Sequence, residues 1–402
     1  MDNELSAQLR DLILNTRVPL RIEDFPRDWE CFRGLLYEWC ECFDKKAAGP
    51  PAFERMSLTD CSTPQWERKR TKANMSMQNF LRDYGCLDAR HTHWAAYQYK
   101  RAHEMPASCL KGIDFSCFGF PDHQNDFTFW LGSEQANTPC HYDTFGVNIV
   151  VQVYGSKSWL LFPPETPLQS TRVPYEESSV YCLDNFYAPA ADKLPRMMEY
   201  SDQAHQCTLE EGDVLIVPRH WWHYVEATAC QLSVNYWVPL KDDMDLALDE
   251  FLVKHIVESF VKGESEETKK YLLNPNQLED ISATPSELFA HFQQAVQNAE
   301  GEEHKRKLWE TDYLTESSFR ELLNKVPVSI RPVEVMPKEE YKLLLESNSE
   351  RRQAETATAA AATAESAPIS STLELLISSM CAPRTIAGMK REFFRRMRQG
   401  DV

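Results

Sequence analysis

TPCHYDTFGVNIVVQVYGSKSWLLFPP, residues 138–164, is the stretch that decides the fold. Its segments 146–154 and 158–162 are short and rich in Val, Ile, Trp and Phe, and Gly155 and Pro163 follow them directly. β-Branched and aromatic residues favour strands, whereas glycine and proline favour turns. The stretch therefore predicts two consecutive strands joined by a tight turn.

The same pattern continues in both directions, at segments 126–132, 214–218 and 231–238. Many short strands separated by turn residues are typical of a β-sandwich or barrel. We therefore expect a mainly β core over residues 93–240. Residues 1–92 begin with leucines at helical spacing, and we expect them to flank this core with helices and a strand.

Two potential metal ligands, His141 and Asp143, lie two positions apart in the opening stretch. On an extended backbone such side chains point the same way, so both can reach one cavity. Segment 218–223 offers a third ligand, either His220 or His223, and these two should face opposite sides of a strand. Two histidines and one carboxylate leave three sites of an octahedral ion open, an arrangement that suits Fe(II).

Five pieces of sequence, in this order, resemble the JmjC oxygenases. They are TPCHYD at 138–143, NIVVQVYGSKSWLLFPP at 148–164, EGDVLIVP at 211–218, WWH at 221–223 and SVNYW at 233–237. The resemblance is to the branch that contains asparaginyl hydroxylases and members associated with small heat-shock proteins. It implies a double-stranded β-helix, a cupin-like jelly-roll, with Fe(II) held at its mouth by His141, Asp143 and His223.

The resemblance also implies 2-oxoglutarate as co-substrate. Lys157 matches a basic residue that pairs with its distal carboxylate, although a lysine here could equally lie in an exposed hairpin. Thr138 would add a hydroxyl to the same carboxylate. Asn148 and Asn235 match amides near the metal-proximal end of the co-substrate, and asparagine is otherwise unusual inside a strand.

One tyrosine of segment 94–99 matches a family residue that hydrogen-bonds the distal carboxylate. We assign this role to Tyr97. Tyr97 and Tyr99 would share one face of a strand. The alternative is that both are packing aromatics.

The implied reaction couples decarboxylation of 2-oxoglutarate to oxidation of a substrate C–H bond. We expect a protein hydroxylase with Fe(II) and 2-oxoglutarate as cofactors, and a protein substrate or a small heat-shock protein as partner. An N-methyl-lysine demethylase with the same cofactors is one alternative. A JmjC protein that works only by binding partners is another, and the complete set of metal ligands argues against it.

After Pro239 the pattern becomes helical, and residues 241–346 predict a helical module. Residues 347–371 are rich in Ser, Ala, Thr and Glu and predict a disordered linker. Residues 372–402 predict a basic amphipathic tail, which either binds a partner or the protein's own acidic surface, or stays solvated. The helices after residue 243 are compatible with a homodimer and equally with packing on their own barrel.

The formal net charge of −18 over 402 residues argues against nucleic acid as a partner. The sequence has no N-terminal signal pattern and no run of about eighteen apolar residues, so we expect no membrane association. Its cysteines form no CxxC pair, which argues against a structural zinc module, and without a signal pattern we expect an intracellular protein with reduced thiols. We therefore expect a cytoplasmic protein. The short basic run at 68–72 would allow a nuclear location too, but it is also typical of a solvated loop.

Overall fold

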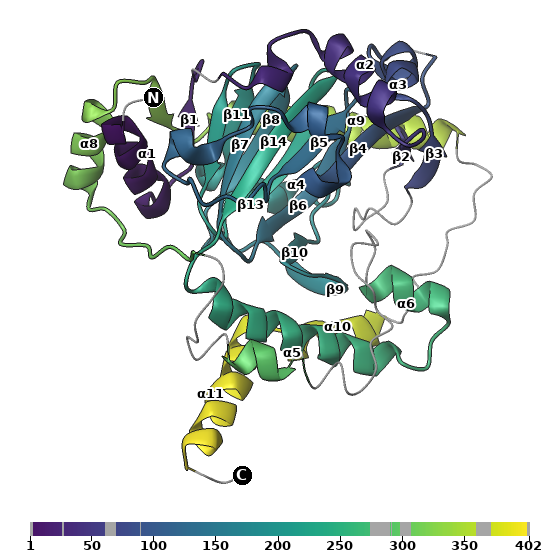
Figure 1. The fold of residues 1–402 in the computed structure, drawn as a ribbon. Helices are drawn as coiled ribbons and strands as arrows, with labels where there is room; N and C mark the ends of the chain where they lie inside the picture. Colours follow the sequence, from purple (N-terminus) through teal and green to yellow (C-terminus); the bar gives the residue numbers. More distant parts are fainter. Residues whose placement is uncertain are drawn as a thin grey trace.

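The computed structural model describes residues 3–25, 28–60, 70–88, 90–273, 290, 292–297, 307–358 and 371–399. Two antiparallel β-sheets face each other at the centre, and helices surround them (Figure 1). The helices of segments 243–273 and 371–399 lie below the sheets in this view, and the first helices of the chain lie above and beside them. The sheets bring together the segments that were expected to carry the site.

Eight strands form the central jelly-roll. They are β5 Thr128–Gly132, β6 Asn137–Asp143, β7 Val147–Tyr154, β8 Lys157–Phe162, β11 His205–Leu209, β12 Val214–Val217, β13 Trp222–Ala227 and β14 Gln231–Val238. In one sheet the order is β12-β7-β14-β5, and in the other it is β11-β8-β13-β6. Because the chain crosses between sheets from β5 to β8 and again from β11 to β14, the expected double-stranded β-helix is confirmed.

Further strands widen both sheets. They are β1 Leu20–Ile22, β2 Ala52–Ser57, β3 Thr71–Asn74, β4 His93–Arg101, β9 Ser170–Glu176, β10 Ser179–Cys182 and β15 Ile330–Pro332. The full orders are β15-β1-β12-β7-β14-β5-β4-β2-β3 and β11-β8-β13-β6-β10-β9. β10 pairs directly with β6, where Tyr181 lies opposite His141. The insert between β8 and β11 therefore borders one strand of the site.

The N-terminal segment covers the outer face of the larger sheet. Its helices are α1 Asn3–Asn15, α2 Leu36–Lys46 and α3 Met77–Tyr84, with 3-10 turns η1 Glu30–Phe32, η3 Ala102–Glu104, η4 Ala107–Leu110 and η5 Phe115–Phe118. Leu12 and Trp39 are buried in one core with Val151 and Val234. Alternation along β7 turns Asn148 to the opposite face, between the sheets. The expected flanking role of residues 1–92 agrees with this packing.

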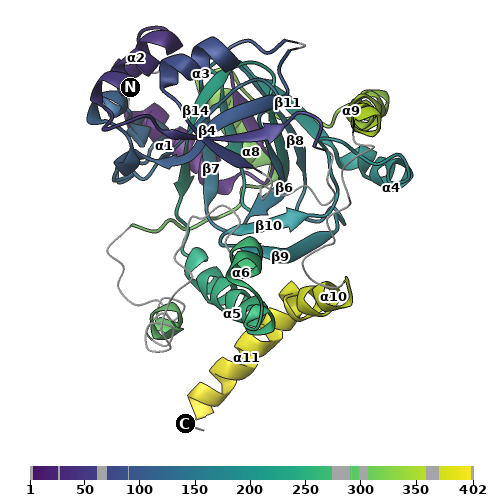
Figure 2. The same cartoon turned by 90° about the vertical axis from the view of Figure 1, so that its right-hand side faces the viewer.

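The C-terminal helices divide between separate places rather than forming one module. They are α5 Asp243–Val261, α6 Glu266–Leu273, α8 Glu316–Lys325, α9 Lys338–Thr358, α10 Ser371–Met380 and α11 Pro383–Gln399, and the insert adds α4 Leu194–Met197 and η6 Met198–Gln203. The helices α5, α6, α10 and α11 gather beside β9, whereas α8 packs on α1 and α9 packs on η6 (Figure 2). Among the described helices, none is both long and apolar enough to cross a membrane.

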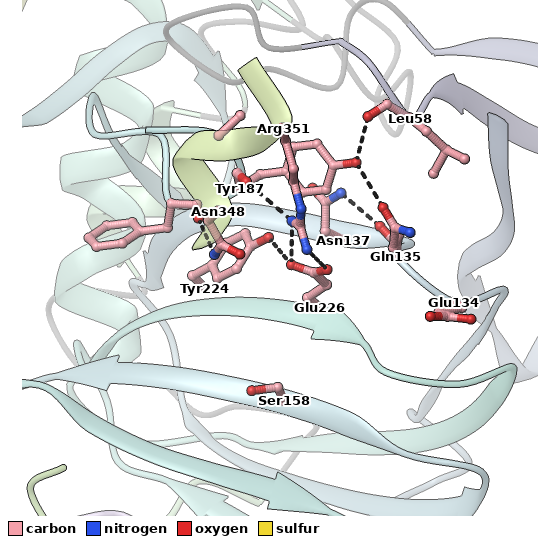
Figure 3. A network of polar contacts seen from close by, with 12 residues as sticks. Leu58, Glu134, Gln135, Asn137, Ser158, Tyr187, Tyr224, Glu226, Asn348 and Arg351 are labelled. Carbon is pink, nitrogen blue, oxygen red and sulfur yellow. Dashed lines mark hydrogen bonds and ion pairs between the residues drawn. The ribbon is translucent and has the colours of Figure 1, made fainter. Parts of the chain in front are cut away.

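Helix α9 begins inside the expected module and continues to Thr358, so the predicted linker boundary at residue 347 is wrong. Residues 359–370, the rest of that predicted linker, lie outside the described residues. In the C-terminal half of α9, tertiary contacts stabilise a helix although the composition there predicts disorder. Arg351 forms a two-pronged ion pair with Glu226 of β13 and donates to the carbonyl of Tyr187, and Asn348 donates to the carbonyl of Phe186 (Figure 3).

Candidate metal centre and its pocket

Three metal-ligating side chains converge from β6 and β13, which are neighbours in the smaller sheet. His223 lies opposite His141 in the register of the two strands, and their ring centroids are 4.2 Å apart. His141 Nε2 lies 3.7 Å from Asp143 Oδ1. One donor atom from each of the three residues lies within 4.8 Å of the others. The structure thus brings together the expected triad.

His220 is not part of this group. Its backbone has φ +68°, outside the strand conformation, and its Nε2 lies 3.2 Å from the carbonyl of Thr144. β13 begins two residues later, at Trp222. His223 therefore enters the strand on its inner face, whereas His220 remains in the preceding turn.

Neighbouring carbonyls fix both histidine rings. His141 Nδ1 lies 2.8 Å from the carbonyl of Pro139, and His223 Nδ1 lies 2.9 Å from the carbonyl of Trp221. A carbonyl can only accept, so both Nδ1 atoms carry hydrogen and both Nε2 lone pairs are available to a metal. Burial, followed by the proximity of His223, lowers the pKa of His141 to about 4. The ring is therefore neutral at physiological pH, the form that binds metals.

The second oxygen of Asp143 is held by protein donors. Trp237 donates its indole N–H to Asp143 Oδ2 at 2.9 Å, and the Asn148 amide donates to the same oxygen at 3.4 Å. Asn235 donates to the Asn148 carbonyl oxygen at 2.8 Å, and Trp130 donates to Asn235 at 2.7 Å. This chain of amides and indoles leaves Oδ1 as the oxygen directed toward the histidines.

A narrow pocket of about 40 Å³ leads from the triad to Lys157. Thr138, Asn148 and Asn235 line it together with Lys157 and the triad, as expected. The Lys157 ammonium is buried and donates to Ser233 Oγ at 3.0 Å. Burial lowers its pKa to about 7, and no carboxylate of the described residues forms an ion pair with it. The pocket therefore presents metal ligands at one end and a cation without a counter-ion at the other.

Tyr97 does not lie in this pocket, so its assigned role is not supported. Its ring packs in the core, 5.7 Å from Phe43 and 5.5 Å from Phe53 by centroid. Tyr99 instead stacks edge-on against Trp130 at 4.4 Å. The register of β4 shifts between Tyr97 and Lys100, and Tyr99 has φ +57°. This bulge breaks the alternation that would have placed both tyrosines on one face.

Sequence reasoning missed Ser233 and Trp237, although a signal for them exists. Both share β14 with Asn235, and alternation along a strand places Ser233, Asn235 and Trp237 on one face. All three line the narrow pocket. A wider cavity of about 660 Å³ adjoins it and shares His141, Asp143 and Trp237 with it. His141 and Asp143 therefore border both cavities, whereas His223 lines only the narrow one.

Several known proteins are similar to this chain in sequence. A match to the family described as "Cupin-like domain" covers residues 6–243. HSPB1-associated protein 1 of Homo sapiens is 37% identical over 246 residues, which cover 57% of this chain and 50% of that protein. Its homolog in Danio rerio is 39% identical over 291 residues, or 67% of this chain and 63% of that protein. The chain therefore belongs to the family of cupin-like JmjC domains.

A more distant relative is named for an activity. Lysine-specific demethylase JMJ30 of Arabidopsis thaliana is 36% identical over 126 residues, which cover 30% of this chain and 28% of that protein. The two HSPB1-associated relatives carry names that state an association and no reaction. The match spans only half to two thirds of their lengths.

Proposed function

We propose that this chain is an Fe(II)- and 2-oxoglutarate-dependent dioxygenase. The observation that carries the proposal is that the triad and the Lys157 ammonium lie at two ends of one narrow pocket. A facial triad of His141, Asp143 and His223 leaves coordination sites open. Lys157 lacks a carboxylate partner among the described residues. A ligand that chelates the ion and carries a second carboxylate suits both ends, and 2-oxoglutarate has this chemistry.

Bound iron, 2-oxoglutarate and dioxygen would supply the oxidising chemistry. The chain's own residues would hold and orient them. Lys157 and Thr138 would bind the distal carboxylate, and the amides of Asn148 and Asn235 lie where they could orient the metal-proximal end. Trp159 is buried and lines the same pocket, where it would help to exclude water from Lys157 and the triad.

We further propose that the substrate is a polypeptide side chain and that the reaction is hydroxylation. The cavity of about 660 Å³ beside the triad has room for a side chain inserted from outside. Demethylation of a methylated lysine is the second candidate, and the name of the Arabidopsis relative favours it. The two reactions differ in their products, since one adds an oxygen atom and the other removes a methyl group.

A small heat-shock protein is the proposed partner, because two relatives are named for association with HSPB1. If the chain acted only by binding this partner, the metal triad would not be needed for its function. The cytoplasmic location, with a nuclear pool as an alternative, and the homodimer both stay predictions.

The test is turnover of 2-oxoglutarate to succinate by the purified chain with Fe(II) and ascorbate, followed by NMR. Succinate should form in the wild-type protein and be lost in Asp143→Ala. The matched control is Asp202→Ala, a surface carboxylate outside both cavities. Mass spectrometry of a co-purified small heat-shock protein then distinguishes gain of oxygen from loss of methyl. Absence of succinate in the wild-type protein would favour a role in association only.

A further inference from the structure

Helix α10 has two apolar faces, and the protein's own core covers only one of them. On the covered face, Ile377 is fully buried against β9 and α5, together with Cys381 just after the helix. On the other face, Leu375 is 69% exposed, Leu376 is 47% exposed and Met380 is 36% exposed. A helix that is apolar on all sides normally has all sides covered.

The exposed residues of α10 follow a helical stripe. They are Thr372, Leu375, Leu376, Ser379 and Met380. Their spacing of i, i+3, i+4, i+7 and i+8 is that of a helix face that packs against another helix. Four of the nine large apolar side chains that are exposed in the described part of the chain lie on α10 and α11, with Met389 as the fourth. The concentration of such side chains marks an interaction surface rather than chance exposure.

Helix α11 adds a basic stripe directly after this apolar one. Arg384, Arg391 and Arg398 are seven residues apart, so they share one face of the helix, and all three are exposed. No ion pair of the described residues involves them. The opposite face of α11 docks on the protein itself, because Lys390 contacts Asp245 and Asp249 of α5 at 2.6 and 2.7 Å. The predicted basic tail thus contacts the protein's own acidic surface on one side only.

We propose that the outer face of α10 and α11, defined by Leu375, Leu376 and Met380 with Arg384, Arg391 and Arg398, is a docking surface for an acidic amphipathic helix of a partner protein. The three apolar side chains would bury the apolar stripe of that helix. The three arginines would form ion pairs with carboxylates that lie beside the apolar stripe of the partner helix.

The charge of α10 and α11 indicates which kind of partner this surface would bind. The chain carries −18 overall, yet the segment from Ser371 to Gln399 contains six basic residues and two glutamates. Lys390, Arg395 and Arg396 already pair with carboxylates of the chain, so the positive charge offered to a partner is that of Arg384, Arg391 and Arg398, and it favours a negatively charged partner. An anionic membrane would meet the same charge, but a helix that lies on a membrane buries its own apolar face there. In α11 that face is already covered, since Ile386 is buried and Phe393 packs on Phe292, so only the three exposed apolar side chains of α10 would be left to enter a membrane.

The experiment uses the full chain and a fluorescent amphipathic peptide of about 20 residues, long enough to be helical, with leucines on one face and glutamates beside them. Fluorescence anisotropy should show saturable binding that weakens as salt is raised. Leu375→Ser with Leu376→Ser should weaken binding by about tenfold or more, because two anchor side chains are lost. Arg384→Gln with Arg391→Gln and Arg398→Gln should weaken it comparably. A peptide with lysines in place of the glutamates should not bind.

Matched controls change similar residues on other faces. Leu343→Ser removes a leucine of α9 that is 63% exposed, and the triple change Arg33→Gln, Arg90→Gln and Arg320→Gln removes three exposed arginines. Both control proteins should bind the acidic peptide as the wild type does. All substituted positions are exposed, so the fold should persist in each variant.

Three outcomes would overturn the proposal. The first is no saturable binding of the acidic peptide, or equal binding by the variants and the wild type. The second is binding to phosphatidylserine vesicles that is lost in the α10 and α11 variants while the peptide fails to bind, which would assign the surface to a membrane. The third is self-association in light scattering that Leu375→Ser with Leu376→Ser abolishes, which would assign it to a second copy of the chain.

Discussion

Trp237 donates its indole N–H to Oδ2 of Asp143 at 2.9 Å, and so sets which carboxylate oxygen faces the histidines. Groups that orient a metal ligand from behind typically contribute 10–100-fold to metal affinity. We expect Trp237→Phe to weaken Fe(II) binding by about 10-fold or more. Isothermal titration under anaerobic conditions measures this directly.

The control is Trp29→Phe, which removes an indole donor to the carbonyl of Asp114, away from both cavities. That protein should bind Fe(II) like the wild type. Unchanged affinity in Trp237→Phe would mean that Asn148 alone holds the oxygen.

Lys157 makes co-substrate binding depend on pH. Its pKa of about 7 means that it is mostly protonated below this pH and mostly neutral above it. A bound dicarboxylate pairs with the protonated Lys157 ammonium, so its binding raises the pKa of Lys157. Affinity for 2-oxoglutarate should therefore be constant below pH 7 and fall by roughly tenfold per pH unit above it.

Titration calorimetry with Mn(II) in place of iron, in buffers of different ionisation enthalpy, should show proton uptake on binding at alkaline pH. The Lys157→Met protein should bind weakly and without this proton uptake. Since burial keeps the pKa of His141 near 4, His141 does not titrate in this window. Affinity that is level from neutral to alkaline pH would contradict the role of Lys157.

Arg351 ties α9 to the strand that carries His223. Arg351 Nη2 lies 2.7 Å from Glu226 Oε1, and the two side chains are 25% and 13% exposed. Tyr224 also donates to Glu226, so loss of the arginine leaves a mostly buried carboxylate with one neutral donor. A double-mutant cycle of Arg351→Leu and Glu226→Gln should give a coupling energy of about 1–3 kcal/mol in denaturant unfolding.

The same cycle for Arg320 and Glu316, an exposed pair on α8, should give about 0.5 kcal/mol or less. Equal coupling in the two cycles would show that the α9 contact adds no more than a surface ion pair.

Local patterns in the sequence predicted a mainly β core and two of the three ligands, whereas the resemblance to the JmjC oxygenases specified the jelly-roll and selected His223 over His220. The alternation of β6 places His141 and Asp143 on one face, and the paired tryptophans mark His223. Tyr97 was mis-assigned because a bulge at Tyr99 reverses the alternation of β4, and no residue type at that position signals φ +57°.

The end of α9 was also hidden from sequence reasoning. Its stabilising partner Glu226 lies 125 positions from Arg351, so periodicity within the helix carries no trace of the contact. The Ser, Ala and Thr composition there indicates weak intrinsic order, and the tertiary bonds outweigh it. The two faces of α10 were likewise unpredictable, because an apolar pattern does not show which residues the core leaves uncovered.

The most direct test of the central claim is an anaerobic titration with Fe(II) and 2-oxoglutarate, monitored by the weak visible charge-transfer absorption of the iron chelate. The site predicts that the absorption appears in the wild-type protein, persists in His220→Ala and is lost in His223→Ala. Absence of the absorption in the wild-type protein, or its survival in His223→Ala, would contradict the assigned metal centre.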